Sequence, residues 1–280
     1  DLKYTSLDEI YIDLQENKYK GIIIDNLYFR NTEIIDVVSS LKSKGFIIVS
    51  PLNWCDKYLH KCPSSSMSQD EILNLQIASN KNQIQFRIKR FNDIFISLIL
   101  LLILSPLFLV ILIFLLVFEG KPIFYSQTRT GINNKTILIS KFRTMIVNAE
   151  RNGPQWSKID DPRITRFGKF LRKYRLDELP QLISVIKGEM SLIGPRPERP
   201  EIETLLREKI PHYNIRNIVK PGISGWAQVN YHYGANLEDS INKLSYDIYY
   251  VKNFSLALDL IILFKTIKII FQARGSQPKN

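Results

Sequence analysis

An uncharged run of 25 residues, 94–118, is the feature that most constrains how this chain can fold. About 20 residues of α-helix cross the hydrocarbon core of a bilayer, so the run is long enough to be a membrane segment. The mean hydropathy of the whole chain, −0.07, conceals the run because the remaining residues have an ordinary soluble composition. The fold must therefore combine a membrane segment with globular parts.

Ser105 and Pro106 lie in the middle of this run. A proline removes an amide donor and clashes with the preceding turn, which bends or breaks a helix. A neighbouring serine hydroxyl can donate to a carbonyl that the proline leaves free. A re-entrant helix–break–helix places both basic flanks in the cytoplasm, and a single kinked span is an alternative that composition leaves equally open. The flanking bases are Lys81, Arg87, Lys89 and Arg90 before the run and Lys121, Arg129, Lys135, Lys141 and Arg143 after it.

The formal net charge of +11 is unevenly distributed along the chain. Residues 1–80 contain 8 basic and 11 acidic residues, which leaves 30 basic and 16 acidic residues for the rest. A basic surface of this kind suits anionic lipid or nucleic acid. The bases alternate with acids and prolines and match no nucleic-acid motif, so we expect no nucleic-acid partner. Cys55 and Cys62 are too few for a disulfide scaffold and lack the companions of a zinc site.

The first 80 residues predict an accessory module followed by a linker. Residues 21–25 and 46–49 have the composition of short buried strands, and a helix is expected between them, from Asn31 or Thr32 to near Gly45. Strand, helix and strand of these lengths indicate part of a parallel α/β unit. No G-x-G-x-x-G follows a strand, so a structural or regulatory role is favoured over nucleotide binding.

The chain after the apolar run is again globular. Helices are expected over 167–173, 178–187 and 201–209, and the Gly-Pro pairs around Pro195 and Pro221 indicate rigid loops. Apolar residues cover most of a last helix, 256–271, which suits either the core or the membrane interface; we expect the core.

Asp177 and Glu178 stand out as candidate catalytic residues. Pro180 suits the first turn of a helix, which would place both acids at the N-terminus of that helix. Spacing alone favours a plain structural interpretation, an N-cap whose charge complements the helix dipole. The surroundings favour phosphate chemistry instead, because guanidinium groups bind phosphate bidentately. The bases nearby are Arg163, Arg166, Lys169, Arg172, Lys173 and Arg175, followed by the rigid Pro195-Arg196-Pro197.

Adjacent carboxylates cannot straddle a glycosidic bond as the pair of a glycoside hydrolase does. They can divide the work at one phosphorus atom, with one carboxylate as the nucleophile. The other can hold Mg²⁺, which takes one or two carboxylates together with substrate phosphates.

From Lys89 onward the sequence resembles the bacterial sugar transferases, the monotopic phosphoglycosyl transferases that act on polyprenyl phosphate. At least seven ordered motifs over about 190 residues make the resemblance specific. They are Lys89-Arg90-Phe91-Asn92-Asp93, Ser105-Pro106, Gln127-Thr128-Arg129-Thr130-Gly131, Lys141-Phe142-Arg143-Thr144-Met145, Asp161-Pro162-Arg163-Ile164-Thr165, Leu176-Asp177-Glu178-Leu179-Pro180-Gln181, Met190-Ser191-Leu192-Ile193-Gly194-Pro195-Arg196-Pro197 and Pro221-Gly222-Ile223-Ser224-Gly225-Trp226-Ala227-Gln228-Val229.

The resemblance implies a role for each matching position. Asp177 would attack the β-phosphate of a UDP-sugar and release UMP, after which polyprenyl phosphate would take the phosphosugar. Glu178 would bind Mg²⁺, and Ser105-Pro106 would break a re-entrant helix. The expected substrate- and phosphate-binding residues are Lys141, Arg143, Arg163, Arg166, Arg172, Gln181, Pro195, Arg196 and Pro197. Ser184, Glu189 and Ser224 depart from the family's usual Asn, Asp and Thr.

The resemblance also implies an α/β fold class with a mixed α+β, largely helical catalytic domain. Residues 1–80 would be a partial Rossmann-like module, 81–120 the basic flank and membrane hairpin, and 121–280 the catalytic domain. We expect a large-type member without its upstream transmembrane helices, on the cytoplasmic face of the bacterial inner membrane. Its partners would be a UDP-sugar, polyprenyl phosphate and membrane lipids, in the first membrane step of exopolysaccharide, capsule or O-antigen synthesis. The oligomeric state stays open, a homo-oligomer included.

Two other functions remain open at this point. One is a membrane-tethered protein whose basic face binds anionic partners. The other is a glycosyl transferase that moves the sugar without its phosphate and uses Asp160 and Asp161 as a metal site. The by-product distinguishes them, since phosphoglycosyl transfer releases UMP, plain glycosyl transfer releases UDP, and a binding protein releases neither.

Overall fold

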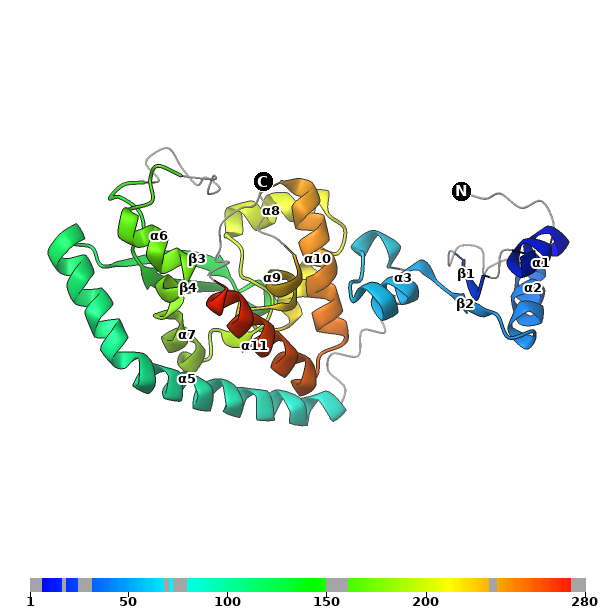
Figure 1. Ribbon diagram of the computed structural model, residues 1–280, viewed down its shortest axis with the longest axis horizontal. Coiled ribbons are helices and arrows are strands. Elements are labelled where there is room, and N and C mark those ends of the chain that lie inside the picture. Colours follow the sequence, from blue (N-terminus) through cyan, green and yellow to red (C-terminus); the bar gives the residue numbers. More distant parts are fainter. Residues whose placement is uncertain are drawn as a thin grey trace. The chain divides into compact units, whose positions relative to one another are not determined.

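The computed structural model describes residues 7–16, 19–24, 32–67, 71–72, 80–149, 161–231 and 236–272 (Figure 1). The chain divides into two compact units, residues 1–74 and 75–280. Each is described separately below.

The first unit contains the predicted parallel β–α–β arrangement. Strands β1 and β2 pair in parallel with Gly21 opposite Ile47, which confirms the expected α/β unit in outline. A side chain at Gly21 would lie 2.1 Å from the carbonyl oxygen of Ile47, so this close strand pairing requires glycine. The elements are α1 (Leu7–Glu16), β1 (Gly21–Ile23), α2 (Thr32–Ser43), β2 (Ile47–Val49) and α3 (Pro51–Trp54).

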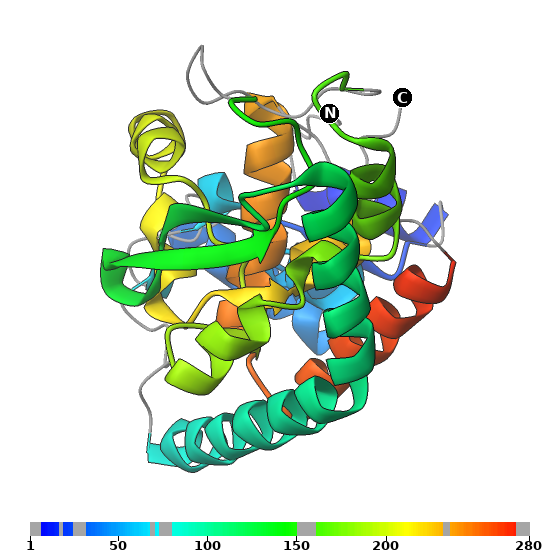
Figure 2. The same cartoon turned by 90° about the vertical axis from the view of Figure 1, so that its left-hand side faces the viewer.

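The apolar run forms the long helix α5, Asn80–Phe114, which ends in a wider turn, Leu115–Glu119. Among the described residues, one helix, Gln83–Glu119, is long and apolar enough to cross a membrane. Figure 2 shows α5 bent into two limbs. The predicted break is therefore a bend within a continuous helix. The hydroxyl of Ser105 donates to the carbonyl of Leu102 at 2.8 Å, the carbonyl that Pro106 leaves without an amide donor.

Buried polar contacts attach the first limb of α5 to the rest of the second unit. The Lys89 ammonium forms a 2.7 Å ion pair with Asp259. The Arg90 guanidinium donates to the carbonyls of Val185 and Ile186 at 2.5 and 2.7 Å. These carbonyls belong to the last turn of α7 (Gln181–Lys187), which needs donors because helical hydrogen bonds end there. Two of the basic flanking residues thus have structural partners within the unit.

The second limb of α5 packs into the core of the same unit. Ile111 and Leu115 are fully buried in a cluster with Phe142 and Leu171. At the end of this limb, the Arg143 guanidinium donates to the backbone carbonyls of Glu119 and Gly120 at 2.7 and 3.0 Å. Both ends of the apolar helix are therefore fastened to one folded unit.

The remainder of the second unit is mixed and mostly helical. Strands β3 (Phe124–Thr130) and β4 (Thr136–Phe142) form an antiparallel hairpin, and β5 (Ser191–Ile193) pairs in parallel with β6 (Gly222–Ser224). This agrees with the expected α/β class at the coarse level. The helices are α6 (Arg166–Lys173), α7 (Gln181–Lys187), α8 (Pro200–Lys209), α9 (Trp226–Asn230), α10 (Leu237–Lys252) and α11 (Leu256–Phe271).

Helix α11 differs from the expectation of a core helix. Leu258 and Ile262 are buried, but Phe264 and Phe271 are 68% and 84% exposed. The helix therefore buries one stripe and leaves much of its apolar surface uncovered, because its apolar residues surround most of the helix and the unit packs against one side only.

A pair of isoleucines on the second limb of α5 tests whether this limb is part of the core. Ile111 is 2% exposed and Ile113 is 50% exposed. We expect Ile111→Ala to lower the free energy of unfolding by about 2–5 kcal/mol, because it leaves a cavity. Ile113→Ala serves as the matched control and should change stability little. Denaturant unfolding in detergent micelles measures both, and equal losses would show that the limb is not docked.

Candidate active site

The acidic pair lies in a short 3₁₀ turn, Leu176–Glu178, between α6 and α7. The expected N-cap arrangement is wrong, because α7 begins at Gln181 with Pro180 at its cap position and without a side-chain cap. Arg175, in the left-handed region with φ 55°, reverses the chain just before the turn. Asp177 and Glu178 are 7% and 5% exposed. Burying two acids that cap no helix costs free energy, so other interactions must stabilise them.

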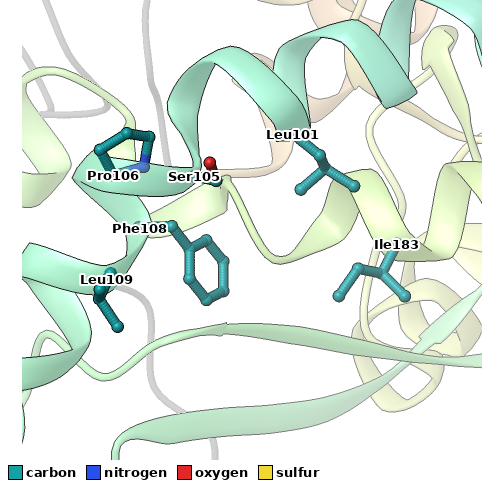
Figure 3. A pocket seen from close by; sticks show the side chains of 6 residues that line it. All are labelled: Leu101, Ser105, Pro106, Phe108, Leu109 and Ile183. Carbon is teal, nitrogen blue, oxygen red and sulfur yellow. The ribbon is translucent and has the colours of Figure 1, made fainter.

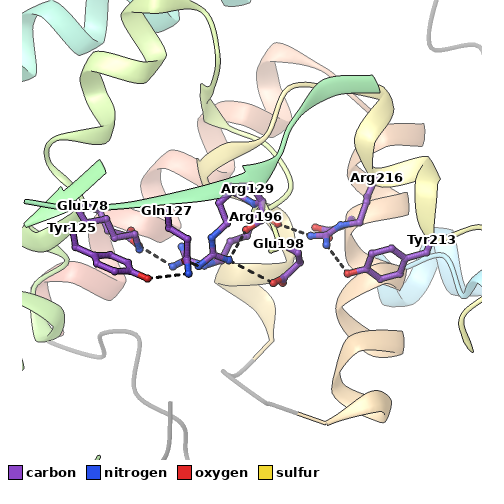
Figure 4. Close-up of polar contacts among 11 residues, drawn as sticks. Tyr125, Gln127, Arg129, Glu178, Arg196, Glu198, Tyr213 and Arg216 are labelled. Atoms are coloured by element: carbon purple, nitrogen blue, oxygen red, sulfur yellow. Dashed lines mark hydrogen bonds and ion pairs between the residues drawn. The ribbon is translucent and has the colours of Figure 1, made fainter. Parts of the chain in front are cut away.

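Glu178 is surrounded by three cations from three parts of the unit. Its Oε1 atom accepts a hydrogen bond from Lys141 Nζ at 2.8 Å. The same atom accepts from Arg196 Nη2 at 2.9 Å (Figure 4). Arg175 Nη1 lies 3.5 Å from Oε2. Burial alone would raise the pKa of Glu178, but Arg196, Lys141 and Arg175 together outweigh it and hold the pKa well below its usual value. Glu178 is therefore a permanently charged carboxylate.

Asp177 is in the opposite electrostatic situation from its neighbour. Burial is the largest influence and raises the pKa of Asp177 to about 6, and the charge of Glu178 adds to the effect. Lys141, Arg172 and Arg196 oppose this rise without cancelling it. Destabilising the charged form of a carboxylate increases its tendency to form a bond, so two adjacent acids have acquired different chemistry.

Lys141 on β4 brings a third charged group to the pair. It faces the same side of the hairpin as Tyr125, its partner in register on β3. Burial lowers the pKa of Lys141, and Arg196 adds to this, while the two acids work against it. The ammonium interacts with both carboxylates, as the Arg196 guanidinium also does, which places both cations where a phosphate at the pair would need neutralising.

Of the predicted phosphate-binding residues, Lys141 and Arg196 reach the acidic pair directly. The charge of Arg172 lowers the pKa of Asp177, and Arg172 Nε donates to Thr144 Oγ1 at 2.8 Å. Pro195 and Pro197, both buried, flank Arg196. Gln181 is buried next to the turn, with no hydrogen-bond partner for its Nε2 atom among the described residues.

Other predicted residues have different positions. Arg143 fastens the end of α5, as described above, and Arg163 forms an ion pair with Asp161 at 2.6 Å. Arg166 is exposed at the first residue of α6. Arg143 and Arg163 are thus bound to groups other than the acidic pair. The sequence made these arginines candidates because of their residue type. The fold determines which partners Arg143 and Arg163 bind.

Arg175 is a site residue that the predicted set omitted. It was counted among the surrounding bases, but its contact with Glu178 depends on the left-handed backbone at Arg175. Spacing gives a partial signal, since residues three apart face one another in a helical turn.

An apolar pocket of about 650 Å³ lies at the bend of α5 (Figure 3). Ser105 and Pro106 line it, and Ile183 contributes from α7, the helix that follows the acidic turn. The remaining lining residues are Leu101, Phe108 and Leu109. The membrane helix and the helix that leads from the active site thus share one apolar space.

The described residues contain no group of three or more His, Cys, Asp or Glu side chains that could hold a metal. Asp160 lies outside the described residues, and Asp161, its companion in the alternative metal site, is paired with Arg163. Glu178 has one carboxylate oxygen that accepts no hydrogen bond from the described residues: its Oε2 is buried and faces Arg175 Nη1 at 3.5 Å. A single protein carboxylate together with substrate phosphates is a common set of Mg²⁺ ligands, so this oxygen fits the expected metal.

The chain was compared with known proteins. A family model described as bacterial sugar transferase matches residues 84–273. A UDP-N-acetylgalactosamine-undecaprenyl-phosphate N-acetylgalactosaminephosphotransferase of Aeromonas hydrophila is 45% identical over 190 residues, which cover 68% of this chain and 45% of that protein. The exopolysaccharide production protein ExoY of Sinorhizobium fredii is 39% identical over 67% of this chain and 87% of that protein. A UDP-glucose:undecaprenyl-phosphate glucose-1-phosphate transferase of Escherichia coli is 37% identical over 64% of this chain and 39% of that protein.

The chain spans less than half the length of the Aeromonas and Escherichia proteins that it matches. The segment that the family model matches includes most of α5, the acidic turn and the Pro195-Arg196-Pro197 loop. This segment lies within the second unit.

The electrostatic contrast in the pair predicts two different titrations in metal-free protein. The Asp177 carboxyl should be protonated below about pH 6 and ionised above it, whereas Glu178 should stay ionised well below its usual range. ¹³C-carboxyl NMR of chelator-treated protein in micelles measures this. Burial also raises the pKa of Asp247 to about 6, so the assignment depends on the signal lost in Asp177→Asn. A signal for Asp177 that titrates near 3.8 would contradict the expectation.

Proposed function

The chain belongs to the bacterial sugar transferase family, and from this premise we propose that it transfers a sugar 1-phosphate from a UDP-sugar to undecaprenyl phosphate. The names of the Aeromonas and Escherichia relatives support both substrates. These two relatives are named for different sugars, so the proposal is made for a UDP-sugar as a class. The relative named for exopolysaccharide production supports a role in the synthesis of surface polysaccharide.

The observation that carries the proposal is the electrostatic difference between Asp177 and Glu178. The pKa of Asp177 is raised to about 6, so its carboxylate is ionised at neutral pH and is a stronger nucleophile than an ordinary one. Glu178 is fixed by three cations and has little tendency to form a covalent bond. The pair thus supports one nucleophile and one stationary charge.

In the proposed first step, an Asp177 oxygen attacks the β-phosphorus of the UDP-sugar. The new bond joins this oxygen to phosphorus, the bond between the β-phosphorus and the bridging oxygen breaks, and UMP leaves with the electron pair. In the second step, a phosphate oxygen of undecaprenyl phosphate attacks the same phosphorus and the bond to Asp177 breaks. The products are undecaprenyl diphosphate sugar and the free carboxylate, so two simple displacements replace one.

The cations around the pair supply the electrostatic part of the mechanism. Lys141 and Arg196 are held on Glu178 before any substrate arrives. Donors that are already oriented stabilise charge on a transferring phosphoryl group without reorganising. Arg172, whose charge lowers the pKa of Asp177, is suited to bind the phosphate of undecaprenyl phosphate in the second step.

We also propose that Glu178 would hold Mg²⁺ together with substrate phosphates, with its Oε2 atom as the ligand, which accepts no hydrogen bond from the described residues and faces Arg175. Such an ion neutralises charge on the diphosphate when bound. The chain's own contribution is to keep Glu178 ionised and oriented, through Lys141 and Arg196 on the other carboxylate oxygen.

The contacts at both ends of α5 support the re-entrant topology. Lys89 and Arg90 at one end and the Glu119 and Gly120 carbonyls at the other contact the same folded unit. A straight span would place these two sets of contacts on opposite sides of a bilayer. We therefore propose that α5 enters and leaves through one leaflet, with the catalytic unit on the cytoplasmic face of the inner membrane, where basic flanks are retained.

The reaction is tested by its by-product. Purified protein in micelles, given undecaprenyl phosphate, Mg²⁺ and a panel of UDP-sugars, should release UMP with at least one of them. Asp177→Asn should abolish turnover, because an amide oxygen does not form the acyl phosphate, and a phosphosugar adduct on Asp177 should be trapped in the parent.

Asp36→Asn, on an exposed position of α2, is the matched control and should leave turnover unchanged. Release of UDP instead of UMP would establish plain glycosyl transfer. Full activity in Asp177→Asn would end the assignment of the nucleophile.

The topology is tested with single cysteines at Gln83 and Lys121, both exposed on either side of the apolar run. The two native cysteines are first replaced by alanine. In intact cells, a membrane-impermeant thiol reagent should label neither position, and both should react once the membrane is permeabilised. Labelling of one position in intact cells would show that α5 spans the bilayer.

A further inference from the structure

Four consecutive backbone carbonyls, those of residues 195–198, each accept a hydrogen bond from a different residue. Pro195 accepts from the Gly222 amide at 2.9 Å, and Glu198 accepts from the Thr130 amide at 2.9 Å. The Arg196 carbonyl accepts from Arg216 Nη2 at 2.7 Å, and the Pro197 carbonyl accepts from Arg129 Nη1 at 3.2 Å. Loops rarely have every carbonyl bound in this way, since most of them face water.

Arg216 is the buried one of the two side-chain donors. Its side chain is 6% exposed and forms a 2.8 Å ion pair with Asp247, which is 3% exposed. Its Nη1 donates to the hydroxyl of Tyr213 at 2.7 Å. The Nη2 atom thus serves Asp247 and the Arg196 carbonyl with its two protons, so Asp247 fixes the direction in which Arg216 donates.

Arg129 holds the loop from the side of the β-hairpin. Its Nη1 lies 3.8 Å from the Glu198 carboxylate, and its Nη2 donates to Gln127 Oε1 at 2.6 Å. Gln127 in turn donates to the Tyr125 hydroxyl at 3.0 Å. Figure 4 shows these side chains of β3 in a row that leads toward Arg196. The Gln127-Thr128-Arg129 part of the sequence, which the reaction itself leaves without a role, therefore reaches the loop.

Arg196, whose own carbonyl is one of the four that are bound, is the residue of this loop that contacts Glu178. Arg196 is flanked by prolines, which fix two backbone angles, and its carbonyl and that of Pro197 are bound from opposite sides. The remaining freedom of Arg196 is that of its side chain. A long flexible cation with a fixed backbone loses less entropy when it takes up one position.

We propose that Arg216, oriented by Asp247, and Arg129 are positioning residues that hold the 195–197 backbone so that the Arg196 guanidinium stays at Glu178 and the reacting phosphate. The proposal rests on the proposed function, because it assigns these residues an effect on phosphoryl transfer. Arg216 and Arg129 would act on the acidic pair indirectly, through the backbone of this loop. Their effect should appear in the chemical step, because misplacing a charged group matters most where charge develops.

The experiment replaces the buried ion pair by apolar residues of similar size, Arg216→Met with Asp247→Leu. This avoids leaving one buried charge unpaired, which would unfold the chain. We expect kcat for UMP release to fall by about tenfold to a hundredfold, and KM for the UDP-sugar to change by less than about threefold. Hydrogen–deuterium exchange at the amides of Gly222 and Thr130 should become faster, because their acceptors are no longer held.

Arg207→Met with Glu203→Leu is the matched control, since it also removes both members of an ion pair with a buried acid. Arg207 lies in the same region and pairs with Glu203 at 2.6 Å, but it does not donate to the loop carbonyls. It should leave kcat unchanged. A folded double variant with parental kcat, or an equal loss in the control, would overturn the proposal.

Arg129→Met decides the question if the double variant fails to fold, since the side chains of Arg129 and Glu198 are 22% and 28% exposed, against 6% and 3% for Arg216 and Asp247. It should lower kcat in the same direction, and parental kcat there would overturn the proposal. A parent that releases no UMP would refute the proposed function. In that case, hydrogen–deuterium exchange at Gly222 and Thr130 tests whether Arg216 and Asp247 hold the loop. Faster exchange in the double variant supports this role, and unchanged exchange refutes it.

Discussion

The buried ion pairs of Glu178 are the interactions on which the rest of the active site depends. Lys141 comes from β4, Arg196 from the loop after β5, and Arg175 from the residue before the acidic turn. One carboxylate therefore joins three parts of the second unit. Burial raises the pKa of Asp177, and the cations, whose hydrogen bonds and ion pairs go to Glu178, do not cancel this rise. The two adjacent acids differ because both are buried but, among the described residues, only Glu178 has cations in direct contact.

The membrane helix is connected to the site through α7. Arg90 of α5 donates to the last carbonyls of α7, and Ile183 of α7 lines the apolar pocket at the bend. The turn with Asp177 and Glu178 directly precedes the same helix. A lipid-linked phosphate that enters along α5 would thus meet α7 before the acids. Since α7 has seven residues, its two ends cannot move independently, and the site is fixed relative to the membrane segment.

The sequence predicted what depends on local pattern. The parallel β–α–β unit, the helices over α6, α8 and α11 and the bend at Ser105-Pro106 follow from periodicity and from proline chemistry. Contacts between distant residues were beyond such reasoning. Arg90 and its acceptors are 95 and 96 residues apart, and nothing in the type of Arg143 distinguishes a helix-end donor from a phosphate ligand. The exposed side of α11 was missed because an apolar sequence does not say how much of a helix its neighbours can cover.

The basic residues of the second unit have different roles, and only some of them concern the acidic pair. Arg163, Arg207 and Arg216 are paired with Asp161, Glu203 and Asp247, so much of the positive charge is already matched inside the fold. Lys141 and Arg196 share a single carboxylate oxygen, which leaves local positive charge in excess beside Asp177. An anionic diphosphate is attracted to this imbalance more than to the average charge, because buried charges act over short distances with little screening. The gathering of several cations around two adjacent carboxylates, more than the net charge, therefore favours phosphate at the acidic pair.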